Sequence, residues 1–476
     1  MGRNGKIRRA PGFEDRAGRD FERLDSAIRS ARDVLYSRGY QPIETPLIEQ
    51  TELFLRRSGG LLSSQLFDFL APDGSDITLR PELTAPVIRH ALEQGGTMHP
   101  MRYQYASPIF RYTERPFDAP PNSVPSKRQY IQAGAELIGA TQAAADGEII
   151  ATAYEMAKRL GIQDVAIRVG HVGLIWEMLG RFNLSERAAL FLANHVSDFS
   201  EGDDDGTAIE SEAIRLGLMP TDSQQSVETQ ASAAHLLTRL ATGSVQLPSA
   251  AEQTSRTAEE VVAGLRRKVE SDVANSDFPR AMELMRRIAR INGDTIPNAA
   301  RIAAEYGLGD LDNIRAIRSV VDAAESAGVD ASDISVDFGL ATSIAYYSGM
   351  IFEVSATVGG EHVALGGGGR YDGLASALGS DEDVPALGFA LNLDTILELN
   401  GGSAASEARR KAVVLAPVDG DADESIVEAA AELRGQGYDV FTLFDTTVDA
   451  GDVASSIGGA KVALVDVSGS LTWVAE

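Results

Sequence analysis

The sequence predicts an α+β protein with an antiparallel sheet flanked by helices, a helical insertion and a small C-terminal α/β domain. Three observations lead to this fold class. Residues 101–110 and 128–138 are long apolar-aromatic segments of strand character. Residues 183–313 change to one helical pattern after another. Residues 412–465 alternate short apolar runs with a helical segment, which is typical of a small α/β domain.

The composition indicates a globular protein of several domains. With 476 residues, of which 44% are hydrophobic, the chain can form two or three domains with sizeable cores. Its formal net charge of −26 opposes nonspecific binding to nucleic acid or to an anionic membrane, although a local basic patch is compatible with it. Solubility or a salty cytoplasm is the simpler explanation of the acidity.

Several kinds of chemistry are excluded. The absence of cysteine removes disulfides, thiolate metal sites and cysteine nucleophiles. The six histidines form no HExxH pair, so we expect no metal site, and no motif requires a cofactor. The basic segment 1–9 leads to Pro11 rather than to an apolar run, and no stretch is long and apolar enough to span a membrane. We therefore expect a soluble, cytoplasmic protein.

The first predicted elements are a helix and a proline-containing strand. Apolar residues recur at helical spacing from Phe21 to Leu35, and the helix should end at Gly39. The strand at 40–49 contains two prolines, which restrict it to a sheet edge or an interface.

A short strand at 76–79 should turn at Pro81 into a second helix that begins near Thr84. Glu82 and Thr84 then lie at a helix N-terminus. Capping and the helix dipole are enough to explain a carboxylate and a hydroxyl there without any ligand.

The strand at 128–138 has two different faces. Because side chains alternate along a strand, Ile131, Ala133, Ala135 and Leu137 form an apolar core face. The other face carries Tyr130, Gln132, Gly134 and Glu136. Amide, glycine and carboxylate together suit a pocket for a small polar ligand, and a solvated outer face is the alternative.

The remaining segments complete a discontinuous core. We predict a core from 1–182 and 314–399, an insertion from 183–313 and a small domain from 407–476. The glycine run at 366–369 lacks the Lys-Ser or Lys-Thr of a P-loop, so it either lets a ligand approach the backbone or forms a hairpin tip. Beyond residue 412 only Arg434 and Lys461 are basic, so the last domain lacks the cations needed to hold RNA.

Several motifs together resemble the catalytic core of histidyl-tRNA synthetases, which are class II aminoacyl-tRNA synthetases. These are Leu-Arg-Pro-Glu-x-Thr-Ala at 79–85, Phe-Arg-Tyr at 110–112, Glu-Arg-Pro at 114–116, the strand 128–136, and Gly-Gly-Arg-Tyr-Asp-Gly at 368–373. Their order and spacing agree with that family. The resemblance covers about residues 12–397 and implies a class II synthetase-like sheet.

The resemblance also implies a histidine pocket. Its carried-over residues are Glu82, Thr84, Arg111, Gln132, Glu136, Tyr346 and Tyr347. Carboxylates and hydroxyls can neutralise an ammonium and accept from an imidazole N–H, and Arg111 matches the arginine that contacts the α-phosphate and the substrate carboxylate. Leu83 departs from the family's usual glycine, which puts the affinity for histidine in question.

Two arginines of the synthetase family do not carry over. Thr342 aligns with the arginine of Arg-Gly-Leu-Asp-Tyr-Tyr, and Thr395 aligns with the arginine of Gly-Leu-Glu-Arg. Preorganised cations lower phosphoryl-transfer barriers by several kcal/mol each, so their loss should nearly abolish adenylation. The loop at 113–127 carries four prolines, which restrict its closure over ATP.

A kept amino-acid pocket without these arginines resembles the regulatory subunits of ATP phosphoribosyltransferase, paralogues of the synthetases. That resemblance implies a non-catalytic homodimer within a hetero-oligomer, joined to a short-form ATP phosphoribosyltransferase catalytic subunit. It implies histidine as the feedback effector of the first step of histidine biosynthesis, and no tRNA or membrane partner. The alternatives are a histidyl-tRNA synthetase in which Arg115, Arg128 or Arg370 replaces the lost cations, and a stand-alone histidine-sensing interaction protein.

Overall fold

The computed structural model describes residues 7–56, 64–95, 100–112, 127–201, 206–219, 276–291, 295–308, 311–340, 347–400, 412–418, 423–443, 449–456, 460–466 and 468–474. The contacts divide the chain into two units. One comprises residues 1–15 and 24–400, and the other comprises residues 16–23 and 401–476. The extents predicted for the core, insertion and small domain stay predictions.

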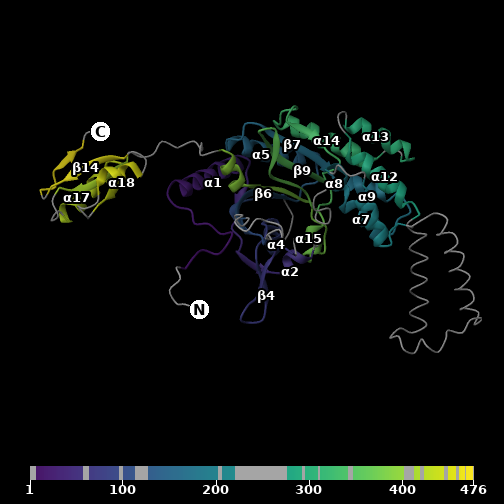
Figure 1. Cartoon of the computed structure of the whole chain (residues 1–476), viewed down its shortest axis with the longest axis horizontal. Coiled ribbons are helices and arrows are strands. Elements are labelled where there is room, and N and C mark those ends of the chain that lie inside the picture. Colours follow the sequence, from purple (N-terminus) through teal and green to yellow (C-terminus); the bar gives the residue numbers. More distant parts are fainter. Residues whose placement is uncertain are drawn as a thin grey trace, which may run out of the picture. The chain divides into compact units, whose positions relative to one another are not determined.

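The first unit is built on an eight-stranded sheet with the order β1-β5-β6-β11-β10-β9-β7-β8. Figure 1 labels β6, β7 and β9 of this sheet. Its strands are β1 (Gln41–Pro42), β5 (Met101–Phe110), β6 (Gln129–Ile138), β7 (Val165–His171), β8 (Ile334–Val336), β9 (Met350–Val358), β10 (Glu361–Arg370) and β11 (Ala386–Asn392). The α+β fold class is confirmed. The sheet is mixed rather than wholly antiparallel, because the edge strands β1 and β8 pair in parallel with β5 and β7.

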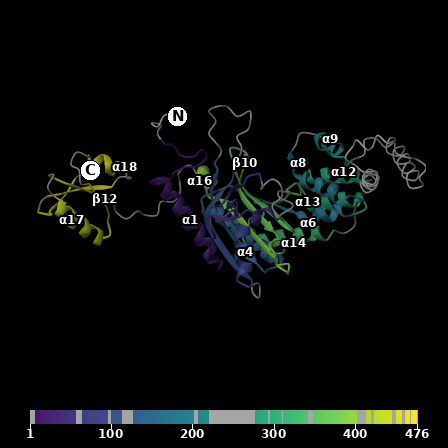
Figure 2. The same cartoon turned by 90° about the horizontal axis from the view of Figure 1, so that it is seen from below.

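The two faces predicted for residues 128–138 are present in β6. Ile131, Ala133, Ala135 and Leu137 belong to a core cluster that also takes the buried sides of α1 (Arg19–Ser37) and α5 (Ala143–Arg159). The opposite side of the sheet packs on α4 (Thr84–Glu93) and α15 (Leu374–Ala377) through Leu83, Val87, Tyr105, Tyr371 and Leu374. One face is thus apolar core, and the other faces the start of α4. Figure 2 shows α1 and α4 from a second direction.

The glycine run is a strand rather than a hairpin tip. Gly367, Gly368 and Gly369 in β10 pair with β9 on one side and with β11 on the other. A Cβ at Gly369 would lie 2.8 Å from the Tyr347 ring. The missing side chains therefore allow close packing inside the protein.

The prolines of the first predicted strand divide it between two sheets. Gln41 and Pro42 form the edge strand β1, whereas β2 (Ile48–Gln50) is an edge of a three-stranded sheet with β4 (Asp76–Leu79) and β3 (Phe67–Leu70). The short α2 (Glu52–Leu55) follows β2. The edge positions agree with the inability of proline to donate to a ladder.

Phe21, which was expected on the apolar stripe of the first helix, is 56% exposed.

A helical cluster follows β7. It contains α6 (Val172–Leu179), α7 (Glu186–Asn194), α8 (Val196–Glu201), α9 (Thr207–Arg215), α12 (Phe278–Ala289), α13 (Thr295–Glu305) and α14 (Asp312–Ser326). Their apolar sides share one core with Phe338, Leu340 and Ile351. These helices agree with the pattern predicted for 183–313, while residues 220–275 lie outside the described part. The loop 113–126, Thr342 and Tyr346 lie outside it too.

The second unit contains a four-stranded sheet with the order β13-β12-β14-β15. The strands are β12 (Ala412–Pro417), β13 (Asp439–Thr442), β14 (Lys461–Val465) and β15 (Leu471–Trp473), accompanied by α17 (Asp423–Gly435) and α18 (Ala450–Ser456). The short apolar runs and the helical segment predicted for 412–465 correspond to β12, β13, β14 and α17, whereas α18 and β15 were not predicted. No helix in the described ranges is long and apolar enough to cross a bilayer.

Candidate functional site

Glu136 is the centre of a buried polar cluster on β6. Its side chain is fully buried, and its carboxylate accepts hydrogen bonds from three hydroxyl groups. Thr84 Oγ1 donates at 2.7 Å and Tyr105 Oη at 3.0 Å, and Tyr371 Oη also donates. The donors come from α4, β5 and the segment after β10, so the fold joins three distant parts of the chain at one carboxylate.

Sheet register explains why a carboxylate fits here. Glu136 lies opposite Tyr103 on β5 and Gly388 on β11. A Cβ at Gly388 would collide with Glu136 Oε2, and one at Gly134 would lie 2.8 Å from Tyr105 Oη. The two glycines therefore create the space that Glu136 and its donors occupy.

Thr84 is the first residue of α4, and Glu82 lies two residues before it. Glu82 accepts from the backbone N–H of Thr84 at 2.5 Å and of Ala85 at 3.1 Å, which satisfies two otherwise unpaired helix donors. Capping is therefore performed by Glu82. The Thr84 hydroxyl instead donates to Glu136, so Thr84 links the start of α4 to strand β6.

The two carboxylates share an environment that disfavours negative charge. Burial raises the pKa of Glu136 to about 8, its three hydroxyl donors act in the opposite direction, and nearby Glu82 adds a smaller upward contribution. Burial also raises the pKa of Glu82, against the stabilising backbone N–H groups and Arg111. A cationic ligand beside them would favour their ionised forms, so the cluster suits an ammonium or an imidazole N–H donor.

Arg111 and Tyr347 lie near the same carboxylates. Arg111 follows β5, and its Nε donates to Pro81 O at 2.9 Å. Burial lowers the pKa of Arg111, while Glu82 opposes that change. Burial, Glu136 and Glu82 together raise the pKa of Tyr347, whose ring centroid lies 6.5 Å from that of Tyr371.

Gln132 lies on the same face of β6 as Glu136, opposite Ser107 and Asn392. Four residues along a strand span about 13 Å, so Gln132 lies well away from Glu136 on the polar face of β6, between Glu136 and Tyr130. The structure thus brings Glu82, Thr84, Arg111, Glu136 and Tyr347 around one cluster, with Gln132 further along the strand. Their role in binding histidine stays a prediction.

Sequence reasoning missed Tyr105, Tyr371 and Gly388 as members of this site. Tyr105 follows the alternation of β5, and Tyr371 follows the glycine run, but nothing local shows that both reach Glu136. The only signal was the position of Tyr371 inside the Arg-Tyr-Asp motif.

The position of the second lost arginine is occupied by a helix start. Thr395 lies in the first turn of α16 (Leu393–Leu399), where Asn392 Oδ1 accepts from the backbone N–H groups of Asp394 and Thr395 at 3.0 and 3.3 Å. Asp394 accepts from Ile131 N at 2.8 Å and from Lys127 Nζ at 3.2 Å. The cation of Lys127 is thus paired with Asp394, an acid of the motif itself.

Two of the arginines considered as replacements have other contacts. Arg370 is buried, and its Nε and Nη2 donate to Asp146 Oδ1 at 3.0 and 2.8 Å. Arg128 stacks on Tyr112 with its Cζ 4.5 Å from the ring centroid. The third, Arg115, lies outside the described residues. Arg370 therefore fixes α5 to β10.

Comparison with known proteins establishes the family. A family model described as histidyl-tRNA synthetase matches residues 12–201 and 243–396. This chain belongs to the histidyl-tRNA synthetase family. The sequence-predicted synthetase-like fold agrees with this membership.

Members similar to this chain carry two different names. A histidine–tRNA ligase of Fervidobacterium nodosum is 28% identical over 437 residues, covering 90% of this chain and 83% of the relative. An ATP phosphoribosyltransferase regulatory subunit of Lysinibacillus sphaericus is 26% identical over 405 residues, covering 85% and 84%. Histidine–tRNA ligases predominate among the similar relatives.

Solved structures show the same fold. A protein of Bacillus halodurans described as an ATP phosphoribosyltransferase regulatory subunit/histidyl-tRNA synthetase has a TM-score of 0.65 at 21% identity, covering 98% of this chain and 99% of that one. The apo histidyl-tRNA synthetase of S. aureus has a TM-score of 0.60 at 18% identity, covering 98% and 97%.

Proposed function

We propose that this chain is a non-catalytic regulatory subunit that binds a short-form ATP phosphoribosyltransferase, supports its activity and makes it sensitive to histidine. One observation carries the proposal. The two segments that align with the arginine-bearing motifs, 334–354 and 385–400, contain no arginine or lysine. Adenylation builds negative charge on the reacting phosphates, which fixed cations must offset.

The contacts of the other arginines support the same proposal. Arg370 is held by Asp146, whose pKa burial raises to about 6 against the attraction of Arg370. Moving this guanidinium to a phosphate would leave a buried carboxylate without its partner, which is strongly unfavourable. Arg370 is thus a poor substitute for either lost arginine.

The site around Glu136 supports histidine as the effector. Glu82 and Glu136 can favour the ammonium group, and Arg111 can pair with the ligand carboxylate. For histidine to act as an allosteric inhibitor, it must bind two states of the assembly with different affinities. The affinity of this chain for histidine and the effect of histidine on the activity of the catalytic partner therefore have to be measured separately.

The exposed face of the three-stranded sheet supports a homodimer within the hetero-oligomer. Register places Ile48, Phe67 and Leu79 in one row and Phe69 beside Ile77 in the next, all on one face. Ile48 and Phe69 are 47% and 44% exposed, whereas Thr78 on the opposite face is fully buried. An apolar face turned outward is typical of a protein–protein contact.

The rival function is histidyl-tRNA synthetase, which is favoured by the names of most similar relatives. Histidine-dependent exchange between ATP and pyrophosphate separates the two functions. We expect the purified chain to show no exchange above a no-enzyme background, with an active histidyl-tRNA synthetase as the positive control. Clear histidine-dependent exchange by the chain would overturn the regulatory proposal.

A stand-alone histidine sensor is the third possibility. A pull-down with a short-form ATP phosphoribosyltransferase tests it, because a regulator must bind that enzyme. We expect a stable complex, while a sensor would bind histidine without retaining the enzyme. The acidic C-terminal domain gives no support for tRNA as a partner, since phosphate binding needs cations.

A further inference from the structure

Helix α12 separates its apolar and basic residues onto different sides. Its buried side consists of Phe278, Ala281, Leu284, Met285, Ile288 and Ala289. The other side of the helix carries charged residues that recur every three or four positions and therefore form one outward stripe. These residues are Glu283, Arg286, Arg287 and Arg290. Packing explains the apolar side alone, and it does not require three arginines on the other.

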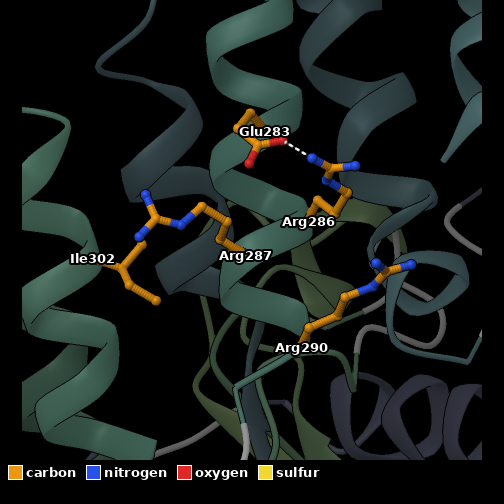
Figure 3. Close-up of a pocket in the computed structure, with 5 residues that line it drawn as sticks. All are labelled: Glu283, Arg286, Arg287, Arg290 and Ile302. Carbon is orange, nitrogen blue, oxygen red and sulfur yellow. Dashed lines mark hydrogen bonds and ion pairs between the residues drawn. The ribbon is translucent and has the colours of Figure 1, made fainter. Parts of the chain in front are cut away.

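The basic stripe lines a hollow of about 350 Å³ (Figure 3). Ile302 of α13 completes its lining, and Figure 3 shows Arg287 reaching toward Ile302 while Arg286 and Arg290 extend to the other side. The side chains of Arg286 and Arg287 are 31% and 34% exposed. A dissolved ion can therefore reach these guanidinium groups.

Neighbouring groups hold the arginine side chains in place. Arg287 Nη2 donates to Glu305 at 2.7 Å, and its guanidinium lies 5.7 Å from the Tyr306 ring centroid. Arg290 Nε donates to Phe199 O of α8 at 2.8 Å, and Arg286 is paired with Glu283. Preorganised donors lose less side-chain entropy when a ligand binds, and a guanidinium carries five N–H donors.

The local charge contrasts with that of the whole chain. Residues 278–290 contain four arginines and one glutamate, in a chain whose formal net charge is −26. Such a basic spot attracts a small anion at short range, while the surrounding acidity repels an extended polyanion such as RNA. The hollow is open to solvent, and its volume of about 350 Å³ is enough for a small anion.

The geometry points to a binding site for a small phosphate-bearing anion in the hollow lined by Arg286, Arg287 and Arg290. Arginine forms charge-assisted, often bidentate hydrogen bonds with phosphate oxygens. The site lies on α12 and α13, is built from other residues than the Glu136 cluster, and does not depend on the proposed regulatory function.

The test is calorimetric titration of the full chain with inorganic pyrophosphate and with inorganic phosphate. We expect saturable one-to-one binding of pyrophosphate, weakened about tenfold by Arg287→Gln and by Arg290→Gln. Arg29→Gln is the matched control, because Arg29 is an exposed arginine of α1 paired with Asp25 at 3.2 Å. Unchanged unfolding midpoints verify that the variants fold.

Phenylglyoxal labelling of the unmutated chain gives a second readout that needs no variant. Pyrophosphate should protect Arg286, Arg287 and Arg290 from modification but leave Arg29 reactive. The proposal is overturned if pyrophosphate shows no saturable binding, if both variants bind it like the unmutated chain, or if protection is absent. It is also overturned if a short RNA duplex binds the stripe while pyrophosphate does not.

Discussion

Thr84 Oγ1 donates to Glu136 Oε1 at 2.7 Å and so connects the first turn of α4 with the middle of the central sheet. Because Glu82 accepts from the backbone N–H groups of the same turn, Thr84 lies between the buried carboxylate of Glu136 and the half-buried carboxylate of Glu82. Both carboxyl groups have a raised pKa, which makes this the place where a cationic ligand would gain most.

Gly388→Ala should disrupt this cluster, because the new Cβ would collide with Glu136 Oε2. We expect histidine affinity to fall at least tenfold, or about 1.4 kcal/mol, as Glu136 loses its hydroxyl partners. Calorimetric titration with histidine measures the change. Gly435→Ala is the matched control, since a Cβ there meets no atom within 4 Å. Equal losses in both variants would contradict the assignment.

Histidine binding should release protons near pH 7. The pKa of Glu136 is raised to about 8, so its carboxyl group is mostly protonated at pH 7 before a cationic ligand favours ionisation. The binding enthalpy should therefore depend on the ionisation enthalpy of the buffer. Glu136→Gln should remove the proton release attributable to this group. Identical release by the variant would assign the proton to another group.

His171→Asn should make the free energy of unfolding less sensitive to acid. His171 caps α6 by accepting from Leu174 N at 3.2 Å, and burial lowers its pKa to about 4 from a usual 6.5. As the pH decreases, this histidine therefore takes up a proton in the unfolded chain before it does so in the folded chain. The free energy of unfolding consequently falls as the pH decreases from about 6.5 toward 4.

Asparagine keeps an N-cap acceptor and does not titrate in this range. Between pH 7 and pH 5 the native chain should lose about 2 kcal/mol more stability than His171→Asn, as measured by urea unfolding. His362→Asn, at an exposed position, serves as the control. The account of His171 is wrong if the native chain and His171→Asn show the same pH dependence.

Arg80→Lys should destabilise the fold. Arg80 is fully buried and donates to Thr45 O at 2.5 Å, Ser107 Oγ at 2.6 Å and Pro108 O at 2.9 Å. The ammonium group of lysine cannot reproduce the planar set of donors of the guanidinium, so some buried acceptors would lose their hydrogen bonds. We expect the free energy of unfolding to fall by about 3 kcal/mol. Urea unfolding measures the loss, and Arg29→Lys should change stability by less than about 0.5 kcal/mol. A similar effect of both variants would contradict the role given to Arg80.

Local patterns predicted the elements of the fold better than their pairing. The alternation of Ile131, Ala133 and Ala135 indicated the core face of β6, and Pro81 indicated the start of α4. Pairing depends on residues far apart in sequence, so no local pattern showed that β1 and β8 would pair in parallel. The glycines at 366–369 were ambiguous because glycine permits both tight packing and a turn.

The candidate site was predictable by residue type but not by contact. Glu136 and Thr84 could be named from motifs, whereas the donors Tyr105 and Tyr371 reach Glu136 only through tertiary folding. Arg370 shows the same limit, because its partner Asp146 lies on α5 and no spacing rule connects them.

Reconstitution with a short-form ATP phosphoribosyltransferase measures whether this chain acts as its regulatory subunit. The enzyme's activity should be measured alone, with this chain, and with this chain plus histidine. We expect that the chain increases the activity of the enzyme, that histidine then inhibits it, and that Glu136→Gln weakens this inhibition while the complex still forms. If the chain changes neither the activity of the enzyme nor its response to histidine, this chain is not its regulatory subunit.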